Sequence, residues 1–213
     1  MEWKHIETNG ISYIEPLEGS SEWYWGMDYT SGDLFEAEEL FQKQHVIKSN
    51  RLVLIKYPEG NLYEPIRAKK GQYIGRPVYY KDAVYCLVVD FCDEAINIYK
   101  CSKNMEHISQ YATIKLKEIK DCYNLALAVS PLTLIRQSHE NVFQIIWPEK
   151  VSFEVDNTES FMYRDGEHLI FSKWFEDPYY REEIIIRDFT GKIIKSMNGA
   201  LSEMPDGQKW LLK

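Results

Sequence analysis

Two short segments of the sequence combine aromatic side chains with carboxylates, and these are the residue types here that could do chemistry. One runs from Glu22 to Asp28 and reads Glu-Trp-Tyr-Trp-Gly-Met-Asp, and the other runs from Trp174 to Arg181 and reads Trp-Phe-Glu-Asp-Pro-Tyr-Tyr-Arg. Aromatic faces can stack on sugars, and paired carboxylates act as acid and base, or as nucleophile, in glycoside hydrolysis. Aromatic side chains also fill the space between packed sheets. The pattern therefore permits carbohydrate chemistry without indicating it.

The second segment is the better candidate for a ligand-binding site. It falls in a long break between two predicted strands, and binding residues concentrate on loops that a rigid scaffold holds. Its proline limits backbone freedom, so the loop loses less entropy when a ligand binds. We expect ligand contacts from Trp174, Glu176, Asp177, Tyr179, Tyr180 and Arg181. For Trp23 and Trp25 in the first segment we expect packing between sheets.

The common catalytic and metal-binding motifs are absent from the sequence. The five histidines show no metal-site spacing, and Gly-x-Ser-x-Gly, Gly-x-Gly-x-x-Gly and P-loop patterns do not occur. The consecutive Ser138, His139 and Glu140 fit a polar hairpin tip, because a catalytic triad must converge from separate elements. Cys86, Cys92, Cys101 and Cys122 contain no Cys-x-x-Cys and are expected to be free, buried thiols. We therefore expect neither a metal nor a cofactor.

The charge balance bears on the class of partner. With 25 Lys and Arg against 33 Asp and Glu, the net charge is −8, which disfavours nucleic acid as a partner. The basic stretch from Arg67 to Lys70 is short and is interpreted as a solvated loop. The N-terminus has no signal-peptide pattern, and no apolar run approaches the length of a membrane span. These features predict a soluble, cytoplasmic protein without a membrane anchor.

The elements that would position these residues are predicted to be antiparallel strands. Apolar residues alternate with polar ones in short runs, and turn residues separate the runs, as in β-hairpins. The strongest turn signals are Asp165-Gly166, for which a type I′ turn is expected, and Thr190-Gly191. Predicted strands cover residues 22–28, 34–41, 51–57, 62–66, 77–80, 84–91, 96–100, 108–114, 124–129, 132–137, 142–147, 151–155, 161–164, 168–174, 183–188 and 193–198.

These strands fall into four-strand units of roughly 40 to 50 residues, the spacing typical of propeller blades. The ends add a predicted hairpin from Trp3 to Glu15 and a strand from Gln208 to Leu212, which together would complete a fifth blade. The chain thus resembles small β-propeller proteins, in architecture alone, as a single domain over residues 1–213. Another antiparallel sandwich or barrel is the alternative fold. Residues 33–43 are predicted as a strand, although Asp33 to Glu36 also fits a helix capping box.

Two functions remain open from the sequence. The first is a non-catalytic binding module that presents a loop face to a protein or a small polar ligand. The second is a carbohydrate-active enzyme that uses paired carboxylates and aromatic stacking. In a propeller, the loops expected on one face are mostly acidic, so a cationic or hydroxyl-rich partner suits them better than a phosphate. These loops are residues 18–22, 69–72, 90–94, 138–141, 156–160 and 176–181.

Overall fold

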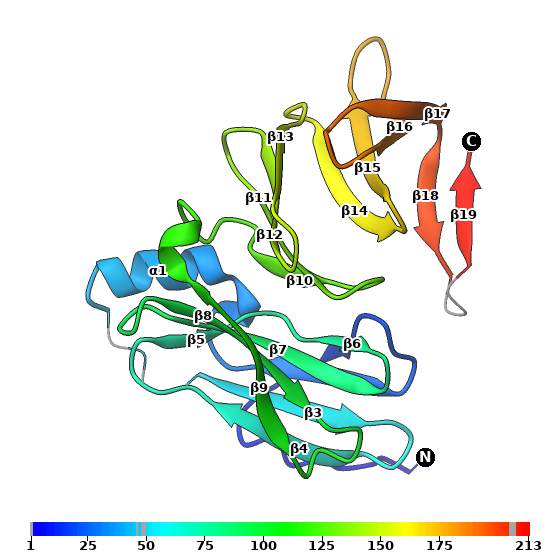
Figure 1. The fold of residues 1–213 in the computed structure, drawn as a ribbon. Helices are drawn as coiled ribbons and strands as arrows, with labels where there is room; N and C mark the ends of the chain where they lie inside the picture. Colours follow the sequence, from blue (N-terminus) through cyan, green and yellow to red (C-terminus); the bar gives the residue numbers. More distant parts are fainter. Residues whose placement is uncertain (1, 46, 48–49, 205–207) are drawn as a thin grey trace. The chain divides into compact units, whose positions relative to one another are not determined.

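The structure, a computed structural model, describes residues 2–45, 47, 50–204 and 208–213 (Figure 1). Within these ranges it is an all-β structure of antiparallel sheets with one α-helix, as the alternating apolar pattern predicted. The chain divides into two compact units, Met1–Leu127 and Ala128–Lys213. The single domain predicted over residues 1–213 stays a prediction. Among the described residues, none of the helices is long and apolar enough to cross a membrane.

The first unit contains two sheets. The first sheet has the order β1-β2-β3-β4, and the second has the order β5-β7-β8-β9 with β6 also paired to β7. The strands are β1 Glu15–Pro16, β2 Trp23–Met27, β3 Arg51–Lys56, β4 Asn61–Arg67, β5 Gln72–Ile74, β6 Val78–Tyr80, β7 Ala83–Asp90, β8 Ala95–Cys101 and β9 Ile108–Lys115. The described part of this unit also contains the 3₁₀ turns η1 Thr30–Gly32 and η2 Leu116–Glu118 and the helix α1, Leu34–Gln42. The hairpins predicted around residues 58–61 and 92–94 are confirmed as β3–β4 and β7–β8.

The core of the first unit joins its two sheets through apolar side chains. Trp23 and Trp25 from β2 are both buried there, together with Leu52 and Leu54 from β3 and Ile74 from β5. This confirms that the two tryptophans pack between sheets, and it removes their segment as a candidate for ligand contact. Cys86, Cys101 and Cys122 are buried and free as predicted, whereas Cys92 is free but exposed.

The second unit contains two four-stranded sheets, β10-β11-β12-β13 and β14-β15-β16-β17, and a two-stranded sheet of β18 and β19. The strand β10, Ala126–Ala128, begins at the division between the units. The others are β11 Thr133–Gln137, β12 Val142–Trp147, β13 Val151–Glu154, β14 Glu159–Asp165, β15 His168–Phe175, β16 Arg181–Arg187, β17 Ile193–Asn198, β18 Ala200–Glu203 and β19 Lys209–Leu212.

Phenylalanine side chains form the core of the second unit. The Phe143 ring of β12 stacks on the Phe161 ring of β14 at a centroid distance of 4.8 Å and meets the Phe171 ring of β15 edge-on at 5.1 Å. Such pairs contribute beyond the area that they bury. This core fixes β15, and β15 with its neighbour β16 carries the loop at residues 176–180.

The two strongest turn signals both mark hairpins. At Asp165-Gly166 the pairing of Asp165 with His168 makes Gly166 the first central residue of the turn, with φ of 58°. Only that central residue has a positive φ, which is the pattern of a type II′ turn and corrects the predicted type I′. At the β16–β17 turn, Gly191 also has a positive φ, and an added Cβ would lie 2.6 Å from Phe153.

The strand predicted for residues 34–41 is wrong, because this segment is the helix α1, Leu34–Gln42. The Asp33 carboxylate caps it by accepting hydrogen bonds from the N–H groups of Phe35 and Glu36, at 2.9 and 3.0 Å. An aspartate cap of this kind satisfies donors that a helix start leaves unpaired. The reciprocal half of a capping box is replaced, since the N–H of Asp33 donates to the carbonyl of Thr30.

The ends of the chain also differ from the prediction. Asn9 and Gly10 do form a turn, both with positive φ, but the described residues before Glu15 form no strand. Side chains hold this segment instead: Lys4 Nζ donates to the carbonyl of Pro58, and Arg51 Nη2 donates to that of Asn9, each at 2.8 Å. At the other end, β19 pairs with β18 in the described part of the chain, rather than with an N-terminal hairpin.

Candidate functional site

The predicted binding residues lie at the tip of the β15–β16 hairpin in the second unit (Figure 1). In the register of this pair, Trp174 lies opposite Glu182, and Phe175 lies opposite Arg181. Residues 176–180 connect the two strands. The tip is therefore a single continuous feature, which we call the β15–β16 tip and define as residues 174–182.

The tip exposes three of its four aromatic side chains to solvent. Tyr179 is 69% exposed, Tyr180 66% and Trp174 39%. Single exposed aromatic residues are common on protein surfaces, but a cluster within one loop marks a candidate interaction site. None of these three side chains is buried in the core.

One face of the tip is organised by Glu182, which sequence reasoning did not select. Its carboxylate accepts a hydrogen bond from the Tyr180 hydroxyl at 2.6 Å and another from the Ser172 hydroxyl at 3.3 Å. The hydrogen bond to this carboxylate raises the pKa of Tyr180, with smaller effects from partial burial and the negative charge. Because Glu182 also lies opposite Trp174, it brings Tyr180 and Trp174 to the same face.

The other face of the tip holds the hairpin together. The guanidinium of Arg181 lies 4.1 Å from the centroid of the Phe175 ring and donates from Nη1 to the carbonyl of Asp177 at 2.9 Å. The ammonium of Lys173 lies 5.2 Å from the same ring and pairs with Asp156 at 2.9 Å. Arg181 is thus part of the scaffold, while the other predicted residues remain at the surface.

The carboxylates of Glu176 and Asp177 are exposed on the connecting loop. Within the described part of the chain, their side-chain oxygens make no hydrogen bond or ion pair. They are adjacent in sequence on one loop, whereas glycoside hydrolysis needs two carboxyl groups on opposite sides of the bond that is cleaved. This arrangement offers negative charge to a partner but not the geometry of an acid and base pair.

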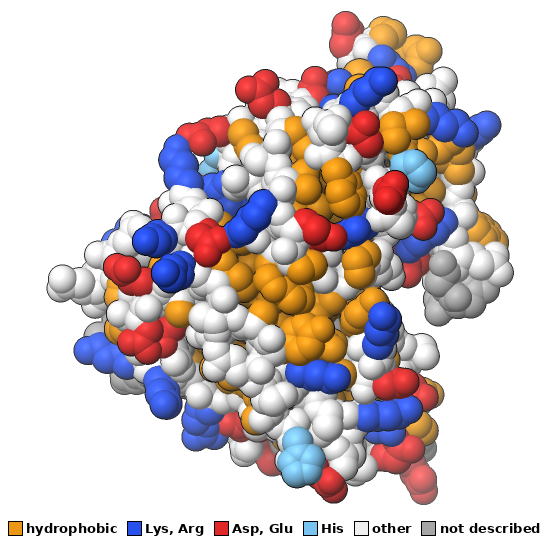
Figure 2. Space-filling view, in the orientation of Figure 1, with side chains coloured by type: hydrophobic (Ala, Val, Ile, Leu, Met, Phe, Trp, Pro, Cys, Tyr) orange, Lys and Arg blue, Asp and Glu red, His pale blue; other side chains and the backbone are white. Residues whose placement is uncertain are grey.

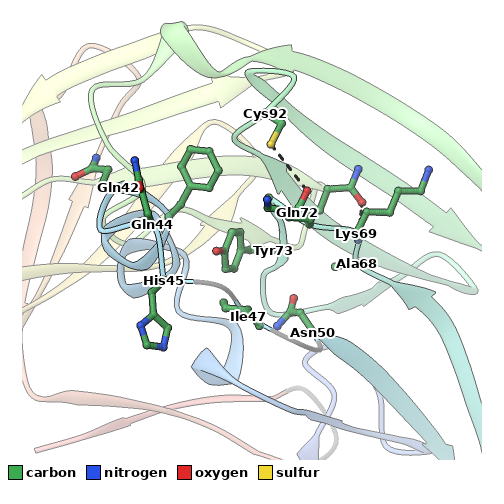
Figure 3. Close-up of a pocket in the computed structure, with 13 residues that line it drawn as sticks. Gln42, Gln44, His45, Ile47, Asn50, Ala68, Lys69, Gln72, Tyr73 and Cys92 are labelled. Atoms are coloured by element: carbon green, nitrogen blue, oxygen red, sulfur yellow. Dashed lines mark hydrogen bonds between the residues drawn. The ribbon is translucent and has the colours of Figure 1, made fainter.

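The first unit has a second candidate, a hollow of about 940 Å³ (Figure 3). It lies between the end of α1, the segment before β5, and the β7–β8 turn. Its described lining is Phe41, Gln42, Gln44, His45, Ile47, Asn50, Ala68, Lys69, Lys70, Gly71, Gln72, Tyr73 and Cys92. No Asp or Glu occurs among these described lining residues, so this hollow lacks the carboxylates that glycoside hydrolysis requires.

Sequence reasoning missed this hollow because its residues come from separate elements. Lys69 and Lys70 were interpreted as a solvated loop, and both are exposed, but they also line the hollow. Burial raises the pKa of Tyr73, and the nearby Tyr29 and Cys92 add to the effect. The tyrosine therefore remains a neutral hydroxyl at physiological pH.

Metal binding finds no support among the described residues. No group of three or more His, Cys, Asp or Glu side chains is arranged to hold an ion within those ranges. On the face that Figure 2 shows, acidic and basic side chains are interspersed rather than gathered into one basic field. A gathered basic field is what binding to a phosphate backbone requires.

Comparisons with known proteins assign this chain to no family. No family model matches the sequence, and no curated protein matches it. Among solved structures, the chain is similar to one from a structural and mechanistic study of two prolyl endopeptidases, with 9% sequence identity and a TM-score of 0.48. The likeness covers 91% of this chain and 29% of that chain, so the protein spans less than a third of the length of its structural neighbour.

Proposed function

We propose that this protein is a non-catalytic binding module that presents the β15–β16 tip to a partner, either a protein or a small polar ligand. The observation that carries the proposal is the exposure of Tyr179 and Tyr180, 69% and 66%, on a hairpin whose base is fixed by the core. A preorganised aromatic loop loses little entropy when it binds. Tyrosine also supplies large contact area with few rotatable bonds.

The side chains of the tip that do not hold the hairpin together favour one kind of partner. Arg181 is committed to Phe175 and the Asp177 carbonyl, so it adds little to recognition. The groups that remain are aromatic faces and the two carboxylates of Glu176 and Asp177. Aromatic faces attract cations and stack on sugar rings, and carboxylates attract cations and accept hydrogen bonds from hydroxyls. The partner we propose is therefore cationic or hydroxyl-rich.

We further propose that the antiparallel sheets are blades of a small five-bladed β-propeller, with β18 and β19 in the last blade. Support comes from the order of strands, since β11 to β13 and β14 to β17 each pair consecutively, as strands in a blade do. Rings of Phe143, Phe161 and Phe171 pack two such sheets in the second unit. In this fold, a hairpin tip such as residues 174–182 belongs to a loop face.

A double substitution, Tyr179→Ala with Tyr180→Ala, tests the binding proposal. We expect a melting temperature close to that of the unsubstituted protein, because both side chains are mostly exposed. As the core reference, Phe171→Ala in β15 should lose about 3–5 kcal/mol, since Phe171 is fully buried. A large loss of stability in the tyrosine double variant would mean that these rings are part of the core and would contradict the proposal.

Binding can be measured by amide chemical shifts with three probes: an octalysine peptide, maltohexaose and an octaglutamate peptide. We expect octalysine or maltohexaose to shift residues 174–182, and the tyrosine double variant to abolish those shifts. Trp3→Ala with Tyr13→Ala is the matched control, because it removes two exposed aromatic residues from the first unit and should leave the shifts intact. Shifts that survive in the Tyr179, Tyr180 variant, or octaglutamate as the best ligand at the tip, would overturn the proposal.

A further inference from the structure

The hollow in the first unit has the aromatic lining of a small-molecule site. The Phe41 ring at the end of α1 stacks on Phe91 with a centroid distance of 5.1 Å and an angle of 21° between the planes. The buried Tyr73 ring meets Phe91 edge-on at 5.5 Å. Phe41 and Tyr73 both line the hollow, and its volume of about 940 Å³ suits a drug-sized molecule. These walls are suited to a flat, apolar ring.

The charged side chains at this hollow are basic, although the chain as a whole is acidic. Within the described part of the chain, the ammonium groups of Lys69 and Lys70 make no ion pair. The lining residue Gln72 is hydrogen-bonded to the carboxylate of Asp90, which does not itself line the hollow. This carboxylate already accepts from Gln72 Nε2 at 2.7 Å and from the N–H groups of Cys92 and Asp93, each at 3.0 Å. The lysines are therefore available to an anion.

Amide groups complete the lining. Gln42, Gln44 and Gln72 all line the hollow, and their side-chain amides provide hydrogen-bond donors and acceptors (Figure 3). The Gln72 amide is held in place, because its oxygen accepts from the N–H of Lys69 at 3.1 Å while its nitrogen donates to Asp90. A fixed polar group beside aromatic walls is typical of sites that orient a small ligand.

We propose that this hollow binds a small planar aromatic anion, with the ring against Phe41 and Tyr73 and the anionic group at Lys69 and Lys70. The site is separate from the β15–β16 tip and uses none of its residues. The anionic group is a carboxylate or a phosphate, since a lysine ammonium binds either as a point charge.

The test uses matched probes that differ in one property: 2-naphthoate, 2-naphthyl phosphate, neutral 2-naphthamide and cyclohexanecarboxylate. Amide chemical shifts of the full chain locate each probe, and titration gives its affinity. We expect the two naphthyl anions to bind with shifts at residues 41–45 and 68–73, and their relative affinities decide between carboxylate and phosphate. We expect 2-naphthamide, which lacks the charge, and cyclohexanecarboxylate, which lacks the aromatic ring, to bind more weakly.

Lys69→Gln with Lys70→Gln should weaken the better naphthyl anion by roughly threefold to tenfold, the range for two partly solvated charges, and should leave the weak binding of 2-naphthamide unchanged. Lys192→Gln with Lys195→Gln removes the same charge from exposed positions in the second unit and serves as the control. The Tyr179, Tyr180 variant should bind the probe normally, so failure here and failure of the tip proposal are distinguishable.

Cys92 supplies a second readout, because it is the exposed thiol among the four and lines the hollow. A bound naphthyl anion should slow its alkylation by iodoacetamide. The proposal is overturned if naphthamide binds as tightly as the anions, if the lysine variant keeps full affinity, or if the shifts and the protection of Cys92 are both absent.

Discussion

Replacing Glu159 with glutamine perturbs a buried ion pair of the second unit. The Glu159 side chain, at the start of β14, is 1% exposed, and the Arg187 side chain, at the end of β16, is 12% exposed. The carboxylate oxygens lie 2.7 Å from Arg187 Nε and 2.8 Å from Nη2, which is a bidentate arrangement. One oxygen also accepts from the N–H of Asp156 at 3.2 Å.

The expected loss of stability follows from the contacts with Arg187 that a glutamine side chain cannot make. Its amide nitrogen would place a donor against a guanidinium donor, and the arginine charge would lose its partner in a mostly dry site. Removing one member of a buried pair costs about 3–5 kcal/mol. Arg187 keeps its hydrogen bond to the Gly191 carbonyl at 2.6 Å and some contact with water, so we expect about 3 kcal/mol.

Urea unfolding followed by circular dichroism, together with amide hydrogen exchange of β14 to β16, measures this loss. Glu149→Gln is the control, because its pair with Arg164 has a longer distance of 3.3 Å and a glutamate side chain that is 42% exposed; it should cost less than about 1 kcal/mol. Glu159→Leu with Arg187→Met should recover most of the lost stability, since it leaves no unpaired charge. Equal effects of Glu159→Gln and Glu149→Gln would refute the reasoning.

Two further perturbations test the fold. Lys173 lowers the pKa of Asp156 below its ordinary 3.8 by a hydrogen bond, with help from Thr158. The stability linked to the ionised carboxylate is therefore complete well above pH 3.8 and is lost as the pH falls through the lowered pKa. Lys173→Met should therefore reduce the fall of the melting temperature at acid pH. An unchanged dependence of the melting temperature on pH contradicts this. Deleting residues 1–16 removes β1 and the buried Ile11 and uncovers the edge of β2, so we expect aggregation or unfolding, and a monomer of nearly full stability would contradict the expectation.

The sequence predicts the hairpins well because period-2 patterns and turn residues are local signals. Asp165-Gly166 and Thr190-Gly191 each mark a hairpin, and the apolar run of Leu169, Ile170 and Phe171 is buried in β15. The predicted type of the Asp165-Gly166 turn was wrong, because the dipeptide alone does not show which residue takes the first central position of the turn. The pairing of Asp165 with His168 moves the turn by one position.

The errors arise where the local sequence fits more than one structure. Residues 34–42 contain apolar residues that fit a strand or a helix, and the capping bonds of Asp33 favour the helix. At the N-terminus, Asn9-Gly10 makes its turn, but the contacts of Lys4 and Arg51 hold the arms without strand pairing. These two contacts join residues 54 and 42 positions apart, and no local pattern contains them.

The same distinction explains what could be predicted about the sites. The β15–β16 tip is contiguous in sequence, so its aromatic and acidic residues were visible together, whereas the hollow combines residues from Phe41 to Cys92 that only folding brings together. The sequence does not reveal which contacts each side chain of the tip makes in the folded chain. Arg181 and Glu182 are as polar as their exposed neighbours, yet Arg181 packs on the Phe175 ring and Glu182 orients Tyr180. Under the proposed function, recognition at the tip comes from Trp174, Tyr179 and Tyr180 and from the carboxylates of Glu176 and Asp177, and a partner that needs the guanidinium would compete with the contacts of Arg181 to Phe175 and to the Asp177 carbonyl.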